Sequence, residues 1–364
     1  MKKKNTIAVI AICIAGMSAA LWFSLRPPGN IPVGIVCWIG SGAVVGSSEI
    51  SAADLFLEEH KSSLIQPVPV DDQWNPDKTA AVVREAMNKG INFFISTHPS
   101  KCAVACIHLF TEPSALLINT ASTSPALSGK DDYFLRIVAD GELEQRAIAR
   151  FVITLPGKRL LLLQDSGNLP YTDPAFKYFS EELKSKDKWE IVHRKLAVSD
   201  FNPQEFHALM SENFDAIYIL AGSFQAAIGN IAQLFHYYHP ESPIILTPWA
   251  RSPAILEIAG SAISRIILPT QYPSRSDDPA FDLYFRRFND RFGYEPHSMA
   301  IGVRQALELL EQAFSKGYKT PEAVKKYLLS IPVHQTSLGP IAFDRYGDVS
   351  QKFYFIHDVE KELR

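Results

Sequence analysis

The sequence predicts an α/β protein built from two doubly wound parallel sheets, and three observations lead to that class. Short apolar runs bounded by turn residues, such as Leu116–Ile118, are typical of buried parallel strands. Segments with helical periodicity separate these runs, which is the pattern of β-α-β units. The alternation occurs once before Pro156-Gly157 and again after it, and 364 residues suit two domains. We therefore expect two similar units with a cleft between them.

The first series begins with a strand at 31–39, a glycine-rich loop at 40–46 and a helix at 47–60. A strand at 64–70 follows, and its Pro67 and Pro69 suit an edge position because proline cannot donate to a neighbouring strand. The remaining elements of this series are a helix at 76–89 capped by Asn75 and stopped by Gly90, a strand at 91–95, a helix at 102–110, a strand at 116–118 and a helix at 140–154.

The second series repeats the pattern, and residues 165–174 between its first strand and first helix are expected to form a polar loop. Its predicted strands are at 159–164, 190–196, 216–220, 243–246 and 263–268, and its helices are at 176–184, 203–213, 224–238 and 255–259. The tail differs, because helices predominate there: 279–292 behind Asp278 as a cap, 298–315 and 321–330, with one further strand at 353–357.

Composition and charge exclude several classes of protein. Apolar residues make up 47% and charged residues 21%, which is typical of a globular chain. The net charge is −3 and no Lys/Arg cluster occurs beyond residue 4, so nucleic acid is excluded as the main partner.

The N-terminus predicts export. Lys2–Lys4 precede an uncharged, mostly apolar run at 7–25, which is typical of a signal peptide. The run is also nearly long enough to span a bilayer, so an uncleaved membrane anchor is an equal alternative. Under either interpretation the bulk of the chain lies outside the cytoplasm.

The cysteines do not follow a metal-binding or disulfide pattern. Cys13 lies in the export segment, which leaves Cys37, Cys102 and Cys106. Nearby histidines do not complete a zinc spacing, and we predict no metal site. Buried free thiols are the expectation, with one disulfide from Cys37 to the other pair as the alternative in an oxidising compartment.

Hydroxyl residues gather where two successive strands end. One group is 96–100 and the other is 119–125, at the carboxyl ends of neighbouring strands. Open α/β sheets bind ligands at this edge, so we expect a site for a small polar or anionic group. Helix capping and turn formation are the alternative role for the same residues.

The loop from Gly40 to Gly46 imitates a dinucleotide fingerprint, with Asp71 ending the next strand. Its spacing is one residue too long, and export argues against a nicotinamide cofactor. An oxidoreductase using this loop is the alternative function from another class, and a tight turn is the structural alternative. No Walker loop, HExxH or GxSxG motif occurs and no acid/base couple assembles, so we predict a protein that is not an enzyme and needs no cofactor.

Five segments, which together extend over nearly everything after residue 30, resemble a known family. They are IPVGIVCWIGSG (31–42), DDQWNPDKTAAVVREAMNKGINFFIS (71–96), INTASTSPAL (118–127) followed by YFLRIVADGELEQRAIARF (133–151), FNDRFGYEPHSMAIGVRQALELL (288–310) and LGPIAFDRYGDV (338–349). In their order and spacing they are similar to the type I periplasmic solute-binding proteins of ABC transporters, in particular the branched-chain amino-acid-binding group.

The resemblance implies two lobes joined by three hinge crossings. The division expected from it is an export segment at 1–30, a first lobe of 31–154 plus 272–332, and a second lobe of 155–271 plus 333–364. It implies a protein in the periplasm or otherwise outside the cytoplasm, tethered to the inner membrane if 7–25 stays uncleaved. Such a protein closes on a small carboxylate, amide or amino acid and delivers it to an ABC permease. The alternative within this fold is a membrane-tethered ligand sensor.

The resemblance also carries over a set of ligand-binding residues. Ser100 matches a serine that holds the ligand carboxylate, and Ser122 and Thr123 match residues that add backbone and hydroxyl contacts. Tyr171 matches an aromatic residue of the second lobe. The remaining expected contacts are Ser41 and Trp38 from the first loop and Trp249 from the second lobe.

The sequence departs from the family where the ligand ammonium is paired. Amino-acid binders place an acid after a second-lobe strand, but residues 247–251 here read Thr-Pro-Trp-Ala-Arg. Either Asp173 or Glu49 serves instead, or the ligand lacks an ammonium group, because burying one unpaired costs several kcal/mol. Trp249 and Trp38 are then candidates for the floor of an apolar or aromatic pocket. The family's disulfide is absent, since Trp74 and Pro99 occupy its positions.

Overall fold

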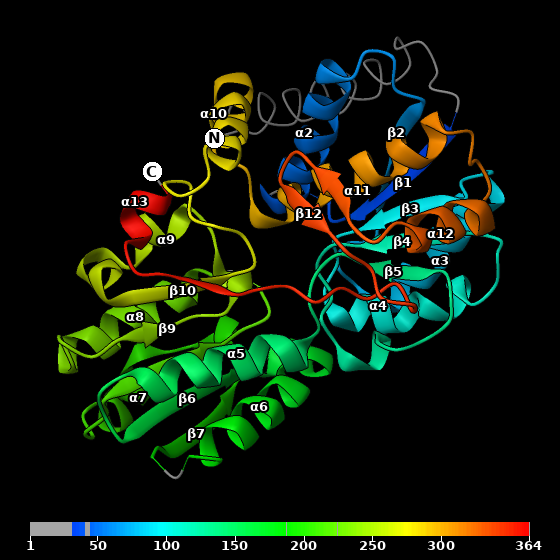
Figure 1. Cartoon of the computed structure of the whole chain (residues 1–364). Helices are drawn as coiled ribbons and strands as arrows, with labels where there is room; N and C mark the ends of the chain where they lie inside the picture. The colour runs from blue at the N-terminus through cyan, green and yellow to red at the C-terminus, as the bar shows by residue number, and fades with distance from the viewer. Residues whose placement is uncertain (1–30, 41–43, 187, 224, 364) are drawn as a thin grey trace, which may run out of the picture.

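The structure, a computed structural model, describes residues 31–40, 44–186, 188–223 and 225–363, and it consists of two α/β lobes (Figure 1). Strand order is β2-β1-β3-β4-β5 in the first lobe and β13-β10-β9-β8-β6-β7 in the second. Every neighbouring pair in the two sheets is parallel except β10 with β13. The predicted fold class is therefore confirmed, and the export segment lies outside the described residues.

The first sheet consists of β1 (Ile31–Cys37), β2 (Ile65–Asp71), β3 (Phe93–Ser96), β4 (Leu116–Asn119) and β5 (Phe134–Arg136). β2 lies at the edge of this sheet and pairs with β1, as its two prolines predicted. Sequence reasoning missed β5, a strand of three residues.

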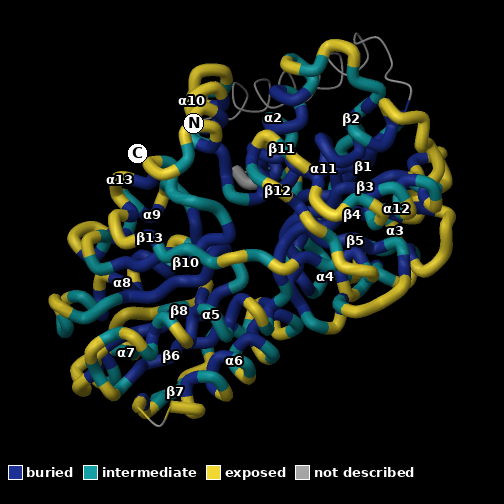
Figure 2. Tube along the Cα trace, in the orientation of Figure 1, coloured by how far each residue is buried: buried dark blue, intermediate teal, exposed yellow. Residues whose placement is uncertain are grey.

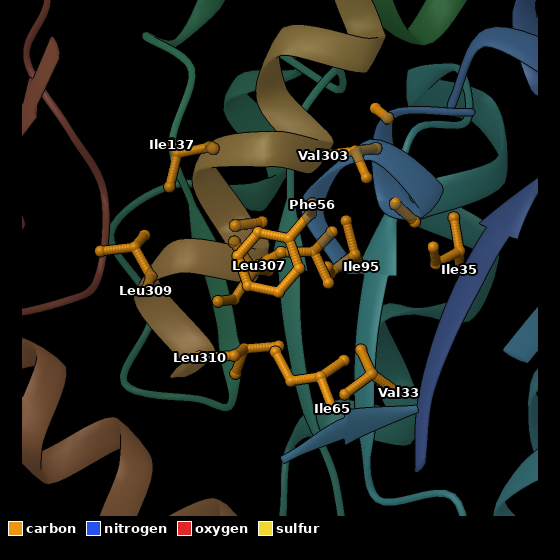
Figure 3. Packing of buried hydrophobic residues seen from close by; sticks show 14 of the residues in the cluster. Val33, Ile35, Phe56, Ile65, Ile95, Ile137, Val303, Leu307, Leu309 and Leu310 are labelled. Carbon is orange, nitrogen blue, oxygen red and sulfur yellow. The ribbon is translucent and has the colours of Figure 1, made fainter. Parts of the chain in front are cut away.

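Helices cover both faces of the first sheet. They are α2 (Val44–Glu59), α3 (Pro76–Asn88), α4 (Ser100–Cys106), α10 (Pro279–Phe292), α11 (Ser298–Ser315) and α12 (Pro321–Ser330), with 3-10 turns η1 (Ile107–Phe110) and η2 (Pro125–Leu127). Asn75 and Asp278 cap α3 and α10 as predicted, each accepting a backbone N–H of the first turn. Figure 3 shows the core beneath α2 and α11, where Phe56 and Leu307 pack against Ile95 of β3.

The second sheet consists of β6 (Arg159–Asp165), β7 (Glu190–Leu196), β8 (Ala216–Leu220), β9 (Ile244–Ile245), β10 (Ile266–Thr270) and β13 (Tyr354–Ile356). Its helices are α5 (Gly141–Thr154), α6 (Leu169–Lys184), α7 (Pro203–Met210), α8 (Ala226–Tyr238), α9 (Ala254–Ile258) and α13 (Val359–Leu363), with 3-10 turns η3 (Ser166–Asn168), η4 (Val198–Asp200), η5 (Pro248–Ala250) and η6 (Gly260–Arg265). Figure 2 shows most strands of the two sheets buried and the outer turns exposed, with β7 at the edge of the second sheet as an exception.

The polar loop predicted at 165–174 is wrong, because α6 begins at Leu169. Pro170 occupies the first turn, where its missing N–H would have no partner in any case. Pro174 lies inside the helix. Two prolines in five residues predicted an irregular segment, whereas one of them starts the helix. Tyr171 consequently projects from the first turn of a helix.

Two boundaries of the predicted lobe division also need correction. Helix α5 packs its buried face, including Ile148 and Val152, into the core of the second lobe. The hairpin of β11 (His334–Thr336) and β12 (Gly339–Ile341) packs with the first lobe through Leu338 and Ile341. The sequence division had placed these two segments in the opposite lobes. The sequence of an amphipathic segment shows which of its faces is apolar. It does not show which lobe buries that face.

The chain crosses between the lobes three times, and side-chain amides join the crossings. Gln271 of the second crossing accepts the backbone N–H of Ala139 in the first at 2.9 Å. Gln351 of the third crossing donates to the carbonyl of Ile137 at 2.9 Å. The red segment in Figure 1 follows the third crossing between the lobes. The three-crossing hinge is thus one hydrogen-bonded unit.

Cys37, Cys102 and Cys106 are buried and free, which confirms the first of the two cysteine predictions. Within the described ranges, no helix has both the length and the apolar character needed to cross a bilayer. The alternatives of cleavage and anchoring concern residues 1–30, outside these ranges.

Candidate ligand-binding site

The two hydroxyl-rich loops of the first lobe lie side by side, because β3 and β4 are paired and end together at Ser96 and Asn119. Ser122 donates its hydroxyl to the carbonyl of His98 at 2.7 Å. Ser100 accepts the backbone N–H of Ser124 at 3.3 Å. The structure therefore brings together Ser100, Ser122 and Thr123, and all three are buried.

The hydroxyls of these three residues differ in what they bind. Those of Ser100 and Ser122 are engaged in tying the loops together. Thr123 Oγ1 is buried and has no hydrogen-bond partner in the protein. A buried hydroxyl left unpaired costs about 1–3 kcal/mol, so this atom is suited to meet a polar atom of a ligand.

A buried ion pair connects one of these loops to the turn after β2. His98 Nδ1 lies 2.9 Å from Asp72 Oδ2, and both side chains are fully buried. Although burial alone would lower the pKa of His98, hydrogen bonding and the charge of Asp72 outweigh it and raise that pKa to about 10. Asp72 also accepts the Thr79 hydroxyl and the backbone N–H of Trp74. The pair thus joins the turn after β2 to the loop that carries Ser100.

Trp38 and Trp74 lie next to each other at the end of the first lobe, with ring centroids 6.0 Å apart and tilted by 49°. A Cβ at Gly46 would lie 1.7 Å from the Trp38 carbonyl oxygen, so the start of α2 approaches the end of β1 too closely for any side chain. Ser41, the other predicted contact from this loop, lies outside the described residues.

Asp71, which a dinucleotide site would direct at a ribose, here stabilises a turn. Its Oδ1 accepts the backbone N–H groups of Ile39 and Gln73, each at 3.1 Å. Together with Gly46, this gives the described part of the glycine-rich segment a structural role.

On the second lobe, Tyr171 and Trp249 converge on a residue that sequence reasoning missed. The Tyr171 hydroxyl donates to Glu144 Oε1 at 2.6 Å, and the Trp249 indole donates to Glu144 Oε2 at 3.1 Å. Gln145 donates to the same carboxylate at 2.8 Å and accepts the Tyr218 hydroxyl. An acid in the first turn of a helix is ordinary in sequence, and nothing there indicated that this one is buried.

Burial raises the pKa of Glu144 to about 7, although hydrogen bonds from Tyr171, Gln145 and Trp249 act in the opposite direction. The carboxyl group therefore titrates near neutral pH. It holds Tyr171 and Trp249 in fixed orientations, and it has no exposed surface.

The two acids considered as partners for a ligand ammonium are poorly placed for that role. Asp173 accepts from Lys195 at 2.7 Å and from Gln164 at 2.6 Å. Glu49 is fully buried and accepts the Thr97 hydroxyl, and burial raises its pKa to about 8. At neutral pH Glu49 is consequently mostly uncharged, and Asp173 is neutralised by a lysine.

The lobes touch where α4 faces α6. The backbone N–H of Lys101 donates to Asn168 Oδ1, and its ammonium donates to the carbonyl of Gly167, each at 3.3 Å. Lys101 follows Ser100 directly, and Asn168 precedes the helix that carries Tyr171. These contacts join the two halves of the predicted site.

Cavities of about 400, 310 and 280 Å³ lie elsewhere in the described structure. They lie beside α13, at the hinge, and between α2 and α11. None of the three is lined by the predicted ligand contacts.

Comparison with known proteins gives a consistent result. The sequence profile of the periplasmic binding protein family matches residues 33–361. A leucine-binding protein from Thermotoga maritima has a TM-score of 0.79 at 18% identity, with 89% of this chain and 94% of that chain covered. No curated protein sequence matches.

Two further solved structures carry ligands. A branched-chain amino acid transporter substrate-binding protein from Streptococcus pneumoniae, in complex with isoleucine, has a TM-score of 0.79 at 19% identity, covering 91% of this chain and 97% of that one. A solute-binding protein of an ABC transporter from Rhodopseudomonas palustris, in complex with 3,4-dihydroxybenzoic acid, has a TM-score of 0.77 at 20% identity, covering 89% and 92%. At these identities the likeness concerns the fold.

Proposed function

The chain belongs to the periplasmic binding protein family, and from this premise we propose that it captures a small carboxylate, amide or amino acid between its lobes. It delivers the ligand to an ABC permease, from a position outside the cytoplasm. The observation that carries the proposal is the unpartnered, buried hydroxyl of Thr123 at the end of β4, within the loop pair that Ser100 and Ser122 hold together.

The proposed contacts are Ser100, Ser122, Thr123 and Trp38 on the first lobe. Tyr171 and Trp249, the contacts on the second lobe, act as apolar walls, because Glu144 already binds their polar atoms. Aromatic faces bury large apolar area, so these walls suit an apolar or aromatic ligand body.

Within this class we favour a carboxylate without an ammonium group. Glu144, Asp173 and Glu49 are each buried, neutralised or both, so none offers a free negative charge. An ammonium group without a partner would lose several kcal/mol on burial. The ligands named for related structures include both types, isoleucine in one and 3,4-dihydroxybenzoic acid in another.

Matched ligand pairs test this proposal. We expect titration calorimetry to show 4-methylpentanoate binding at least tenfold more tightly than leucine, and 3-phenylpropanoate more tightly than phenylalanine. A dissociation constant near micromolar, about −8 kcal/mol, is expected for a good ligand. Tighter binding of the amino acids would overturn the preference for a ligand without an ammonium group. Mass spectrometry of the ligand released from denatured protein identifies the natural one.

A further inference from the structure

Trp74 has a backbone conformation that is unusual for a large side chain. Its φ is 49°, and the preceding Gln73 has a φ of 54°. Among the described residues these are the two with positive φ that are not glycine. The left-handed region is unfavourable for residues with a Cβ atom, and bulky residues in it cluster at functional sites.

Two acidic side chains hold the backbone in this conformation by accepting hydrogen bonds from it. Asp72 Oδ1 accepts the backbone N–H of Trp74 at 3.0 Å, and Asp71 Oδ1 accepts that of Gln73 at 3.1 Å. Asp72 is fixed in turn by His98 and by the Thr79 hydroxyl at 3.0 Å. The backbone that carries the indole is thus held in place by hydrogen bonds from its surroundings.

The indole of Trp74 has an unused hydrogen-bond donor. Its Nε1 is buried without a partner, whereas buried tryptophan N–H groups usually find one. The ring packs against the buried cluster that contains Ala121 of the first lobe and Tyr171 and Trp249 of the second. Its ring centroid also lies 6.0 Å from that of Trp38, so Trp74 lies beside a proposed contact of the first lobe.

We propose that Trp74 is a specificity-determining residue of the ligand site, whose indole N–H donates to an oxygen of the ligand and whose ring packs on its apolar body. The inference rests on the proposed function and adds a contact that the family resemblance does not assign. Trp74 and Thr123 thus each supply an unpartnered polar atom from a loop of the first lobe, and Trp74 selects ligands that combine an oxygen acceptor with a flat or apolar body.

Trp189 provides a matched control. Its indole Nε1 is also buried without a partner, but it precedes β7, at the end of the sheet opposite the cleft edge. It has no left-handed backbone. Both residues thus have an unpaired indole N–H, whereas the strained turn and the position beside Trp38 belong to Trp74.

The test compares Trp74→Phe, Trp74→Gly and Trp189→Phe in the full chain. The probes are 3-phenylpropanoate, phenylalanine, 4-methylpentanoate and leucine, measured by calorimetry together with the melting temperature of the unliganded protein. We expect Trp74→Phe to weaken the tightest probe at least tenfold without lowering the melting temperature. Trp74→Gly should abolish binding, and because glycine accepts positive φ freely, relief of strain should offset part of the packing lost with the ring, so that the melting temperature falls only slightly. Trp189→Phe should bind as the parent does.

Each contrary outcome has a separate meaning. Unchanged affinity in Trp74→Phe would overturn the role of the indole N–H while leaving the proposed function intact. A large loss of stability in Trp74→Gly would assign Trp74 a structural role instead. If the parent bound none of the four probes, the proposed ligand class would fail, and this inference with it.

Discussion

His98 and Asp72 form an ion pair in which neither side chain has any exposed surface, with 2.9 Å between Nδ1 and Oδ2. The pair joins two segments that are 26 residues apart in sequence. Ser122 bonds to the carbonyl of His98, and the backbone of Trp74 bonds to the carboxylate of Asp72. A charge pair without contact to solvent therefore positions both parts of the proposed first-lobe site.

Breaking this pair should destabilise the protein strongly. Asp72→Asn leaves the His98 imidazolium buried without a counter-charge, and we expect a loss of about 3–5 kcal/mol in the free energy of unfolding. Urea denaturation measures it. Asp71→Asn is the control, because an amide oxygen can still accept from Ile39 and Gln73. If Asp72→Asn and Asp71→Asn lowered the free energy of unfolding equally, the ion pair would have no special role in stability.

The same pair predicts a pH dependence. Because the pKa of His98 is raised to about 10 from its ordinary 6.5, its stabilisation is complete below pH 6.5 and is lost as the pH rises through 10. The unfolding free energy of the parent should fall across this alkaline range. His98→Gln should lack this alkaline fall in the free energy of unfolding. If the variant showed the same fall as the parent, the pH dependence would not come from His98.

Glu144 predicts a fall in stability with rising pH as well, but in a lower pH range than His98. Its folded pKa is raised to about 7 from 4.5, so the folded state holds its proton more tightly and stability falls as the pH rises from 4.5 to 7. The contribution is on the order of 3 kcal/mol. Glu144→Gln should flatten this slope in urea titrations at several pH values. A slope identical to that of the parent would show that the carboxyl group does not titrate there.

Two of the three hydroxyls in the proposed first-lobe site should respond differently to removal. Thr123→Val deletes an unpartnered group, so we expect ligand affinity to fall at least tenfold without loss of stability. Ser100→Ala removes the acceptor of the Ser124 N–H, so stability should fall by about 1–3 kcal/mol as well. Calorimetry and thermal unfolding measure both quantities. Full affinity in the double variant would place the ligand elsewhere.

A second charge pair, in which only the arginine is fully buried, should determine how the third crossing is anchored. Arg136, with 1% of its side chain exposed, donates through Nη2 to Asp348 Oδ1 at 2.6 Å. Asp348→Ala leaves the guanidinium without its counter-charge and should cost about 3–5 kcal/mol. Asp344→Ala, in the same turn, is a comparison that removes only backbone bonds to Tyr346 and Asp348. A smaller effect for Asp348→Ala than for Asp344→Ala in urea denaturation would contradict this ranking.

Sequence alone determined the features that depend on neighbours along the chain or on the general geometry of α/β sheets. Pro67 and Pro69 predicted an edge strand because they lack N–H donors, and Asn75 and Asp278 predicted helix starts because their side chains accept free N–H groups. Ser100 and Ser122 could be placed together because parallel strands end at one edge.

Only the tertiary structure decided which distant groups meet. Glu144 and Trp249 are 105 residues apart and their bond has no local signature, so a first-turn acid gave no sign that it is buried. The strained turn at Trp74 depends on His98 holding Asp72, and the lobe that covers α5 depends on apolar surface contributed by remote strands. Local patterns report the preferences of a segment, whereas burial, pKa and strain arise from everything packed around it.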